Sequence, residues 1–446
     1  MTRRLALLFG LVVLLIPLAV GCGGDDDDEG AGDTGAAETS EGGGGGGASG
    51  SVSVMAVWTG PEQQAFQAVL DGFQEQNPDV DVNYTSAGDQ LPTQLATAVQ
   101  GGNPPDIAVL PQPGLMADFA GQGALQPIDF AQSDIEENFG QSVIDLGTVD
   151  GTLYGFLFKA ANKSTVWYNV QAFEDAGVEP AEEWEAFLEN ASTLSASGVP
   201  AYSIGGADGW TLTDLFENIY LRTAGPEKYD QLAAHEIPWT DQSVKDALTE
   251  MGKVLGDTQN IAGGTQGALQ TDFPTSVTQV FSDPPDAAQV MEGDFVAGVI
   301  TDSTEAEPET GFNVTAFPAI GESGNVIVGG GDTVVMFEDS PAAQALVTYL
   351  TTPEAAEIWA ERGGFASLNK SVDPSVYPDE ITRTTAGALA ETETFRFDLS
   401  DLQPAEFGGT VGQGLFKLFQ DFLQNPDDVD GISQQMEKAA TQAFGN

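Results

Sequence analysis

The chain of 446 residues contains one cysteine, one histidine and only 14 lysines and arginines. Zinc sites need several Cys or His ligands, and a catalytic triad or a Cys/His pair would have to use His235. No Gly-x-x-x-x-Gly-Lys-Ser/Thr phosphate-binding loop is present either. We therefore expect no metal site and no cofactor. A glycosidase needs only a pair of Asp or Glu side chains, so the composition leaves that class of enzyme open.

Positive charge is scarce. The 14 Lys and Arg residues stand against 68 Asp and Glu residues, which gives a formal net charge of −54. Such a surface repels nucleic acid and anionic lipid, so we expect neither to be a partner. It favours solubility and suits a saline medium. Because Cys22 is the only cysteine, the chain forms no internal disulfide.

The chain has a single long apolar run, residues 5–20, which follows Arg3-Arg4. A positive start and a run of this length are typical of a secretory signal, and the run is short for a transmembrane helix. The next residues, Gly21-Cys22, complete a segment that resembles the bacterial lipobox, although the match is loose at Ala19 and Val20. We predict a signal peptide at residues 1–21 and a lipid anchor on Cys22. The alternative is a plain secreted protein with an unmodified Cys22.

Residues 22–50 are rich in glycine and acidic residues and offer almost nothing to bury. This composition predicts a disordered acidic tether between the anchor and the folded body. The remaining residues, 51–446, are enough for two α/β lobes with substantial cores.

Residues 52–114 have the most regular pattern in the chain. A β-prone run ends at Trp58, and Thr59-Gly60-Pro61-Glu62 is typical of a helix start. Helical spacing then alternates with period-two runs, which predicts a β-α-β-α-β unit with parallel strands. Ligands of open parallel sheets bind beyond the carboxyl ends of the strands, where this pattern places Trp58 and Gln112. The alternatives are a core position for Trp58 and an ordinary turn position for Gln112.

Later segments have less regular patterns. Lys159 lies at the end of a predicted strand, where it either contacts a ligand or makes a salt bridge. Trp210 precedes a predicted helix, in a position suited to the floor of a cleft. Residues 291–300 predict a turn and a strand of small residues, and residues 326–336 predict two strands around a triple glycine.

Several blocks together resemble the extracellular solute-binding proteins of ABC sugar importers (family 1), and most closely the α-glucoside-binding subgroup. They include Trp58-Thr59-Gly60-Pro61-Glu62, Pro111-Gln112-Pro113-Gly114, Trp167-Tyr168-Asn169, Leu221-Arg222-Thr223-Ala224-Gly225-Pro226-Glu227 and Gly329-Gly330-Gly331-Asp332. The resemblance covers nearly everything from Val54 to the C-terminus. The chain departs from the subgroup near Ser203 and Ala287, where members often carry a cysteine pair. The identity of the sugar is therefore left open.

The resemblance implies an α/β fold of the two-lobe periplasmic-binding-protein type (type II), with a ligand cleft between the lobes. The chain crosses the hinge several times, and we expect crossings near residues 160–163, 307–317 and 369–379. Lobe 1 would comprise residues 51–161 and 312–372, and lobe 2 residues 162–311 and 373–446. Ligand contacts with both lobes would bias the hinge toward the closed state.

The resemblance also implies which residues hold the ligand. A sugar needs flat aromatic faces for its C–H surfaces and donors and acceptors for its hydroxyls. The expected ligand-binding residues are Trp58, Thr59, Glu62, Gln112, Lys159, Asn162, Trp210, Asp214, Asp294, Phe295, Gly330 and Asp332.

The function that the resemblance implies is capture of an α-glucoside or other oligosaccharide and its delivery to the transmembrane subunits of an ABC permease, without catalysis. We expect a monomer, lipid-anchored through Cys22 on the extracytoplasmic face of the bacterial membrane. One alternative is a receptor for another solute on the same fold. An acidic cleft favours a polyamine, whereas a phosphate ester would need more Lys and Arg. A more remote alternative is a secreted glycosidase with an Asp/Glu pair.

Overall fold

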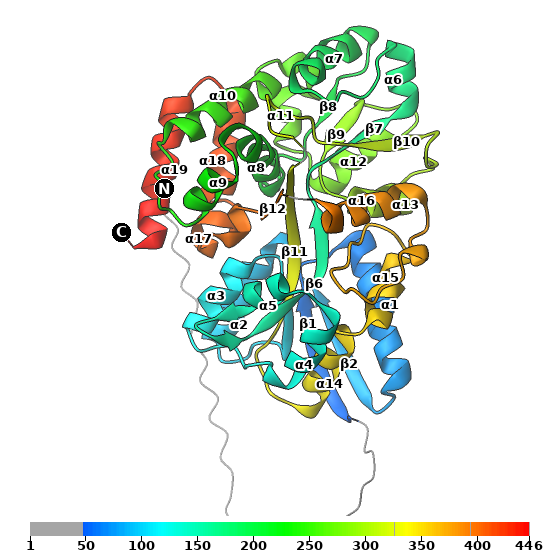
Figure 1. Cartoon of the computed structure of the whole chain (residues 1–446), viewed down its shortest axis with the longest axis vertical. Helices are drawn as coiled ribbons and strands as arrows, with labels where there is room; N and C mark the ends of the chain where they lie inside the picture. Colours follow the sequence, from blue (N-terminus) through cyan, green and yellow to red (C-terminus); the bar gives the residue numbers. More distant parts are fainter. Residues whose placement is uncertain (1–47, 325, 393, 446) are drawn as a thin grey trace, which may run out of the picture. The chain divides into compact units, whose positions relative to one another are not determined.

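The computed structural model describes residues 48–324, 326–392 and 394–445. The predicted signal peptide, Cys22 and tether residues 23–47 lie outside the described residues. The described chain forms two α/β halves, each built on its own sheet (Figure 1). No described helix combines the length and the apolar character that a bilayer crossing requires.

The first sheet contains the N-terminal strands. Its order is β12-β11-β3-β1-β2, and β6 also pairs with β11. Strand β1 is parallel to β2 and β3, which confirms the predicted β-α-β-α-β unit. Strand β11 is antiparallel to β3 and β6. The strands are β1 (Gly50–Ala56), β2 (Val80–Ser86), β3 (Ile107–Leu110), β6 (Gly155–Asn162), β11 (Val326–Met336) and β12 (Thr394–Phe397).

Helices cover both faces of this sheet. Because side chains alternate along a strand, Ile107 and Val109 enter one core while Ala108 enters the other. The first core also takes α1 (Gly60–Gln76), α4 (Gln132–Asn138), α5 (Gln141–Leu146), α14 (Pro341–Leu350) and α15 (Pro353–Ala360). The second core takes α2 (Leu91–Gln100) and α3 (Pro113–Gly121). A small hairpin, β4 (Thr148–Val149) and β5 (Thr152–Leu153), precedes β6.

The second sheet has the order β10-β7-β9-β8 and also carries a core on each face. Its strands are β7 (Thr165–Asn169), β8 (Tyr202–Ser203), β9 (Gln289–Met291) and β10 (Phe312–Ala316). The larger core takes α6 (Val170–Ala176), α7 (Trp184–Ser197), α8 (Trp210–Ala224), α9 (Pro226–Ala233), α10 (Gln242–Leu255), α11 (Gly264–Ala268), α17 (Ala405–Gly408), α18 (Gly414–Gln424) and α19 (Val429–Phe444). The smaller core takes α12 (Phe273–Phe281), α13 (Val296–Ser303) and α16 (Glu380–Glu391).

Short 3₁₀ turns complete the described secondary structure. They are η1 (Gly88–Gln90), η2 (Asp129–Ala131), η3 (Thr258–Asn260), η4 (Pro374–Val376) and η5 (Ser400–Leu402). Of these, η1 and η5 contribute residues to the cavity described below.

Two sequence predictions of strands were wrong. The predicted strand of small residues within 291–300 is largely helix α13. Its buried residues Val296, Val299 and Ile300 in fact have helical spacing, which outweighs their β propensity. The predicted pair of strands around the triple glycine is one continuous strand, β11. A Cβ on Gly331 would lie 2.6 Å from the Lys159 carbonyl oxygen, so glycine is what allows β6 to lie this close to β11.

The chain passes between the sheets several times. Strand β6 belongs to the first sheet and β7 to the second, so one crossing lies at 163–164, within or beside the predicted stretch. Strand β10 pairs with β7 in the second sheet, although the predicted lobe 1 included residues 312–316. Strand β12 pairs with β11 in the first sheet, although the predicted lobe 2 included it. The lobe boundaries stay a prediction.

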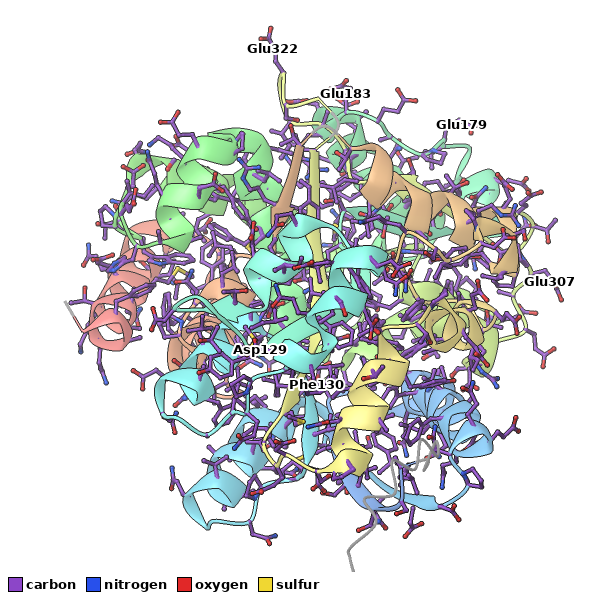
Figure 2. The ribbon with its side chains drawn as sticks, turned by 60° about the horizontal axis from the view of Figure 1, so that its bottom comes forward. Asp129, Phe130, Glu179, Glu183, Glu307 and Glu322 are labelled. Atoms are coloured by element: carbon purple, nitrogen blue, oxygen red, sulfur yellow. The ribbon has the colours of Figure 1, made fainter. Side chains whose placement is uncertain are left out.

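Several acidic side chains are exposed on the protein surface. Glu179, Glu183, Glu307 and Glu322 are exposed and point outward in Figure 2. This distribution agrees with the acidic surface expected from the composition.

Candidate ligand-binding site

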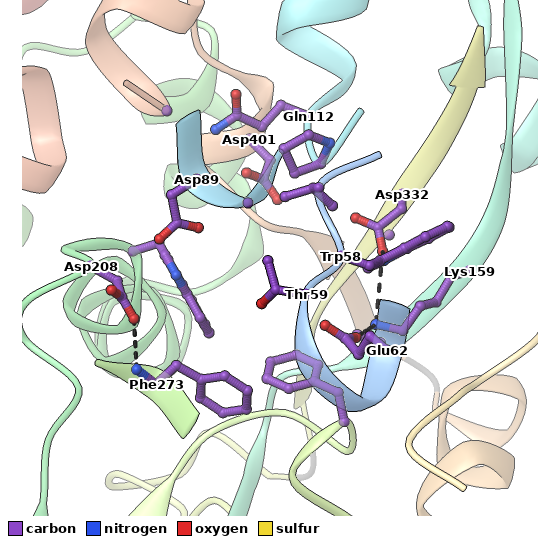
Figure 3. A pocket seen from close by; sticks show the side chains of 18 of the residues that line it. Trp58, Thr59, Glu62, Asp89, Gln112, Lys159, Asp208, Phe273, Asp332 and Asp401 are labelled. Carbon is purple, nitrogen blue, oxygen red and sulfur yellow. Dashed lines mark hydrogen bonds and ion pairs between the residues drawn. The ribbon is translucent and has the colours of Figure 1, made fainter. Parts of the chain in front are cut away.

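A cavity of about 310 Å³ lies between the two halves (Figure 3). One wall comes from the residues that follow the parallel strands β1, β2 and β3. The opposite wall comes from the loop before α8, the start of α12 and α18. The lining residues on which the following paragraphs rest are Trp58, Thr59, Glu62, Asp89, Gln112, Lys159, Lys163, Asp208, Trp210, Asp272, Phe273, Phe295, Asp332, Asp401 and Phe416.

Trp58 lines the cavity and is also part of the core. Its indole Nε1 donates a hydrogen bond to Asp332 Oδ2 at 2.8 Å. Its ring lies 4.6 Å from Phe66 and 4.7 Å from Trp359, measured between centroids. Only 2% of Trp58 is exposed, so neighbouring rings cover most of its faces. The core position that the sequence left open for Trp58 is therefore largely what the structure shows.

Gln112 lines the same wall of the cavity, after the end of β3. It directly precedes α3 and is 4% exposed. Among the described residues its Oε1 has no hydrogen-bond partner. The Gln112 amide packs against Gly409, where a Cβ would clash with it. This packing holds the side chain at the cavity wall.

Lys159 is a buried cation with carboxylates beside it. Its Nζ lies 2.8 Å from Glu62 Oε1 and 3.7 Å from Asp332 Oδ2. Burial alone would lower the pKa of Lys159, but the charges of Glu62 and Asp332 raise it above its usual value. The Nζ also lies 5.1 Å from the ring centroid of Phe295. Lys159 thus makes a salt bridge and lines the cavity at the same time.

The second wall is aromatic. The ring centroids of Trp210 and Phe273 lie 5.3 Å apart, and those of Phe273 and Phe295 lie 5.2 Å apart. Trp210 is partly exposed at the start of α8, and Phe416 lines the cavity from α18. These rings give the second half a broad apolar surface that faces the polar residues of the first.

Carboxylates gather at one side of the cavity. Asp208 Oδ2 accepts a hydrogen bond from the Phe273 backbone N–H at 2.6 Å. Burial and, to a lesser extent, the charges of Asp89 and Asp272 together raise the pKa of Asp208 to about 7, although the hydrogen bond from Phe273 lowers it. In the part of the chain that the structure describes, no cationic side chain lies within 4 Å of Asp89, Asp208 or Asp272. Asp272 Oδ1 also accepts a hydrogen bond from the Thr275 backbone N–H, and the remaining carboxylate oxygens of this group can accept hydrogen bonds from a ligand.

A buried ion cluster adjoins the cavity, and its members Lys163 and Asp401 line it. Lys163 Nζ is 2.5 Å from Asp398 Oδ2, 3.0 Å from Asp214 Oδ1 and 3.9 Å from Asp401 Oδ2. Burial raises the pKa of Asp214 to about 8 despite Lys163. Burial would also raise the pKa of Asp398, but Lys163 and neighbouring hydrogen bonds lower it to about 2. Asp398 is therefore the carboxylate that stays charged beside Lys163.

The structure brings eight of the expected ligand-binding residues to the cavity wall. These eight residues are Trp58, Thr59, Glu62, Gln112, Lys159, Trp210, Phe295 and Asp332. The other four do not line it. Asp294 accepts a hydrogen bond from the backbone of Asn162, Asp214 pairs with Lys163, and Gly330 packs against the Lys163 side chain.

Several lining residues were not predicted. Asp89, Asp272 and Asp401 lie in short loops or turns, where no periodic pattern marks them. Asp208 stands two residues before Trp210, so the loop that singled out Trp210 also contained Asp208. His235 lies away from the cavity, 3.3 Å from Glu437. Among the described residues, no group of three or more His, Cys, Asp or Glu side chains is placed to hold a metal ion.

Solved structures share this arrangement of two α/β halves. A chitin oligosaccharide binding protein matches with a TM-score of 0.76 at 19% identity, covering 89% of this chain and all of that one (100%). The likeness confirms the predicted fold, an α/β two-lobe periplasmic-binding-protein fold of type II.

Sequence relatives cover most of the chain. The osmoprotective compounds-binding protein GgtB of Synechocystis sp. is 36% identical over 372 residues, covering 82% of this chain and 86% of that protein. The alpha-glucosides-binding periplasmic protein AglE of Rhizobium meliloti is 34% identical over 403 residues, covering 87% of this chain and 86% of that protein. The family profile of bacterial extracellular solute-binding proteins matches residues 58–357. The chain belongs to the bacterial extracellular solute-binding protein family.

Proposed function

We propose that this solute-binding protein captures an α-glucoside or other oligosaccharide in the cavity and delivers it to an ABC permease. The observation that carries the proposal is the contrast between the two walls. The wall with Trp210, Phe273 and Phe295 is aromatic, and the wall with Glu62 and Gln112 is polar. A pyranose has apolar C–H faces and an equatorial rim of hydroxyls, so it matches both walls at once.

One of the two relatives supports a sugar as the ligand. The name of AglE states that it binds alpha-glucosides, and the name of GgtB states that it binds osmoprotective compounds. Both cover more than four-fifths of this chain. Binding without catalysis is part of the same proposal, and the names of both relatives, which are those of binding proteins, support it.

The carboxylates of the cavity favour one alternative, a cationic solute such as a polyamine. Asp89, Asp208 and Asp272 line one side of the cavity, and the two lysines that line it are already paired with carboxylates. A polyamine would bring its own positive charge to these side chains. Aromatic faces suit both the C–H surface of a sugar and the charge of a polyamine, so the titration below has to distinguish the two.

Calorimetric titration with maltose, trehalose, sucrose, maltotriose, glucose and spermidine tests the proposal. Micromolar or tighter binding of one sugar, with no hydrolysis product after prolonged incubation, would support the sugar receptor. Binding of spermidine alone would move the assignment to a cationic solute. Cleavage of a bound sugar would identify a glycosidase and overturn the proposal.

The protein acts outside the cytoplasm, as its family does. We propose that Cys22 carries a lipid that anchors the protein to the membrane and that the protein is a monomer. We also propose that the residues after Cys22 form a tether, which ends before Gly50 rather than at residue 50, because Gly50 begins β1. Two acyl chains would anchor the protein stably where one would not. A Cys22→Ser protein that stayed in the membrane fraction at normal yield would contradict the anchor, and light scattering tests the monomer.

A further inference from the structure

The cavity has a neighbour on the far side of Glu62. This second cavity measures about 860 Å³ and lies among α1, α13, α15 and residues 304–308. Glu62, in the first turn of α1, lines both cavities. The smaller cavity lies near the low end of the range for ligand pockets, about 300–1,000 Å³. Glu62 therefore stands between a small compartment and a larger one.

The contacts of Glu62 hold it firmly in this position. Its Oε1 lies 2.8 Å from Lys159 Nζ, as the dashed line in Figure 3 marks. Lys159 is itself 3% exposed and packed near the rings of Phe295 and Trp359, at 5.1 and 5.9 Å. A buried cation needs a neighbouring anion, so the ion pair restrains the Glu62 side chain. Glu62 acts as a fixed partition rather than as a mobile side chain.

The larger cavity offers groups that suit further sugar units. Gln64 lines it with an amide, and Thr301 and Thr304 add hydroxyls that already donate to the Ala297 and Ile300 carbonyls. Besides Glu62, the charged lining residues are Asp302, Glu305, Glu307, Glu361, Asp379 and Arg362. The Gln64 amide can donate and accept hydrogen bonds, and the hydroxyl and carboxylate oxygens can accept them from the hydroxyls of a sugar. The cavity is also bounded by both halves of the protein, because α1 packs on the first sheet and α13 on the second. An extended ligand would contact both halves there too.

We infer that the Glu62 side chain limits the length of the oligosaccharide that the protein accepts. A short sugar fills the small cavity and ends against Glu62, and a longer one is rejected because the partition blocks the larger cavity. This inference rests on the proposed function and adds a size limit to it. Glu62 is a specificity-determining residue whose bulk, rather than whose charge, sets the limit.

The test compares wild type, Glu62→Ala and Glu62→Gln in titrations with the series from maltose to maltohexaose. In wild type we expect a threshold number of glucose units, above which the affinity falls by about tenfold or more. In Glu62→Ala this fall should move to a longer chain or vanish, because the partition is gone. Glu62→Gln keeps the bulk and removes the charge, so its fall should stay at the wild-type length. The three proteins are compared by the chain length at which the affinity drops, since both substitutions also change the absolute affinity.

A second variant checks that longer chains use the larger cavity. Thr301 is exposed on α13 and lines that cavity, so Thr301→Trp in the Glu62→Ala background should restore the wild-type limit. Lys159 Nζ also lies 3.7 Å from Asp332 Oδ2, so we expect Glu62→Ala to retain an anion beside the buried cation. An unchanged limit in Glu62→Ala, or a limit moved by Glu62→Gln, would overturn the inference alone. Failure of every sugar to bind any variant would overturn the proposed function as well.

Discussion

Asp208 is expected to make the protein less stable as the pH rises from about 4 to about 7. Its pKa is about 7 in the folded protein, raised from 3.8 by burial and by the charges of Asp89 and Asp272. Between these two values the folded state holds a proton that the unfolded state has released. The folded state binds more protons, so the free energy of unfolding falls with rising pH. The stability that the proton provides is complete below the unfolded pKa and is lost above about pH 7.

The size of the effect follows from the two pKa values. A difference of about three pH units corresponds to at most about 4 kcal/mol. Asp208 lines the cavity and is only partly buried, so solvent screening reduces this to about 1–2 kcal/mol. Asp208→Asn removes the charge and keeps an oxygen that accepts the hydrogen bond from the Phe273 N–H. We therefore expect this variant to be more stable than wild type by about 1–2 kcal/mol near pH 8 and equal to it near pH 4.

Urea denaturation at several pH values measures this difference. Asp427→Asn is the matched control, because it removes the same charge from an exposed residue between α18 and α19. The control should follow the wild-type dependence on pH, and Asp208→Asn should flatten it. If Asp208→Asn lost as much stability between pH 4 and 8 as wild type, the reasoning would be refuted.

Two further predictions concern charge. Lys163→Met leaves Asp398 and Asp214 buried without their cation, so we expect the free energy of unfolding, measured by urea denaturation, to fall by about 3–5 kcal/mol. The loss should be larger at pH 8 than at pH 6, and an equal loss at both pH values would argue against an electrostatic cause. The net charge of −54 repels itself across the surface, so raising NaCl from about 0.1 M to about 1 M should raise the urea midpoint. A midpoint that stayed constant or fell would contradict that prediction.

The N-terminal unit could be predicted closely from the sequence because every local signal agreed. The period-two runs, the helical spacing and the start at Thr59-Gly60-Pro61-Glu62 all indicated the same elements, and β1, α1 and β2 follow them. Thr59 does occupy the N-cap of α1, although its side chain makes no capping hydrogen bond. A segment can be predicted from sequence when its local propensity, hydrophobic periodicity and capping residues all favour the same structure.

Other elements could not be predicted because tertiary contacts decide them. The β-branched residues of α13 favoured a strand on propensity, yet the segment packs as a helix on the smaller core of the second sheet. The three glycines of β11 indicated a break, yet β6 and β11 pair through them at close approach. Neither partner strand nor packing face can be read from the segment itself.

The candidate site could be predicted only in part, because some of its residues follow a local pattern and others are brought together only by folding. Trp58, Glu62 and Gln112 follow predicted strands, and the rule for parallel sheets places such residues together. Asp89 and Asp272 come from loops 183 positions apart in the sequence, and only the folded chain brings both to one cavity. Asp214 and Asp294 lie close to cavity residues in the chain but turn into buried hydrogen bonds and ion pairs.

The most direct test of the sugar-receptor proposal is the affinity of Trp210→Ala for the best-bound sugar of the panel. Trp210 is partly exposed on the aromatic wall, and its ring offers the apolar face that a pyranose needs. We predict a loss of about tenfold or more, which corresponds to about 1.4 kcal/mol, in a protein with wild-type denaturation behaviour. An unchanged affinity in the folded variant would show that the ligand does not bind against this wall, and the proposal would fail.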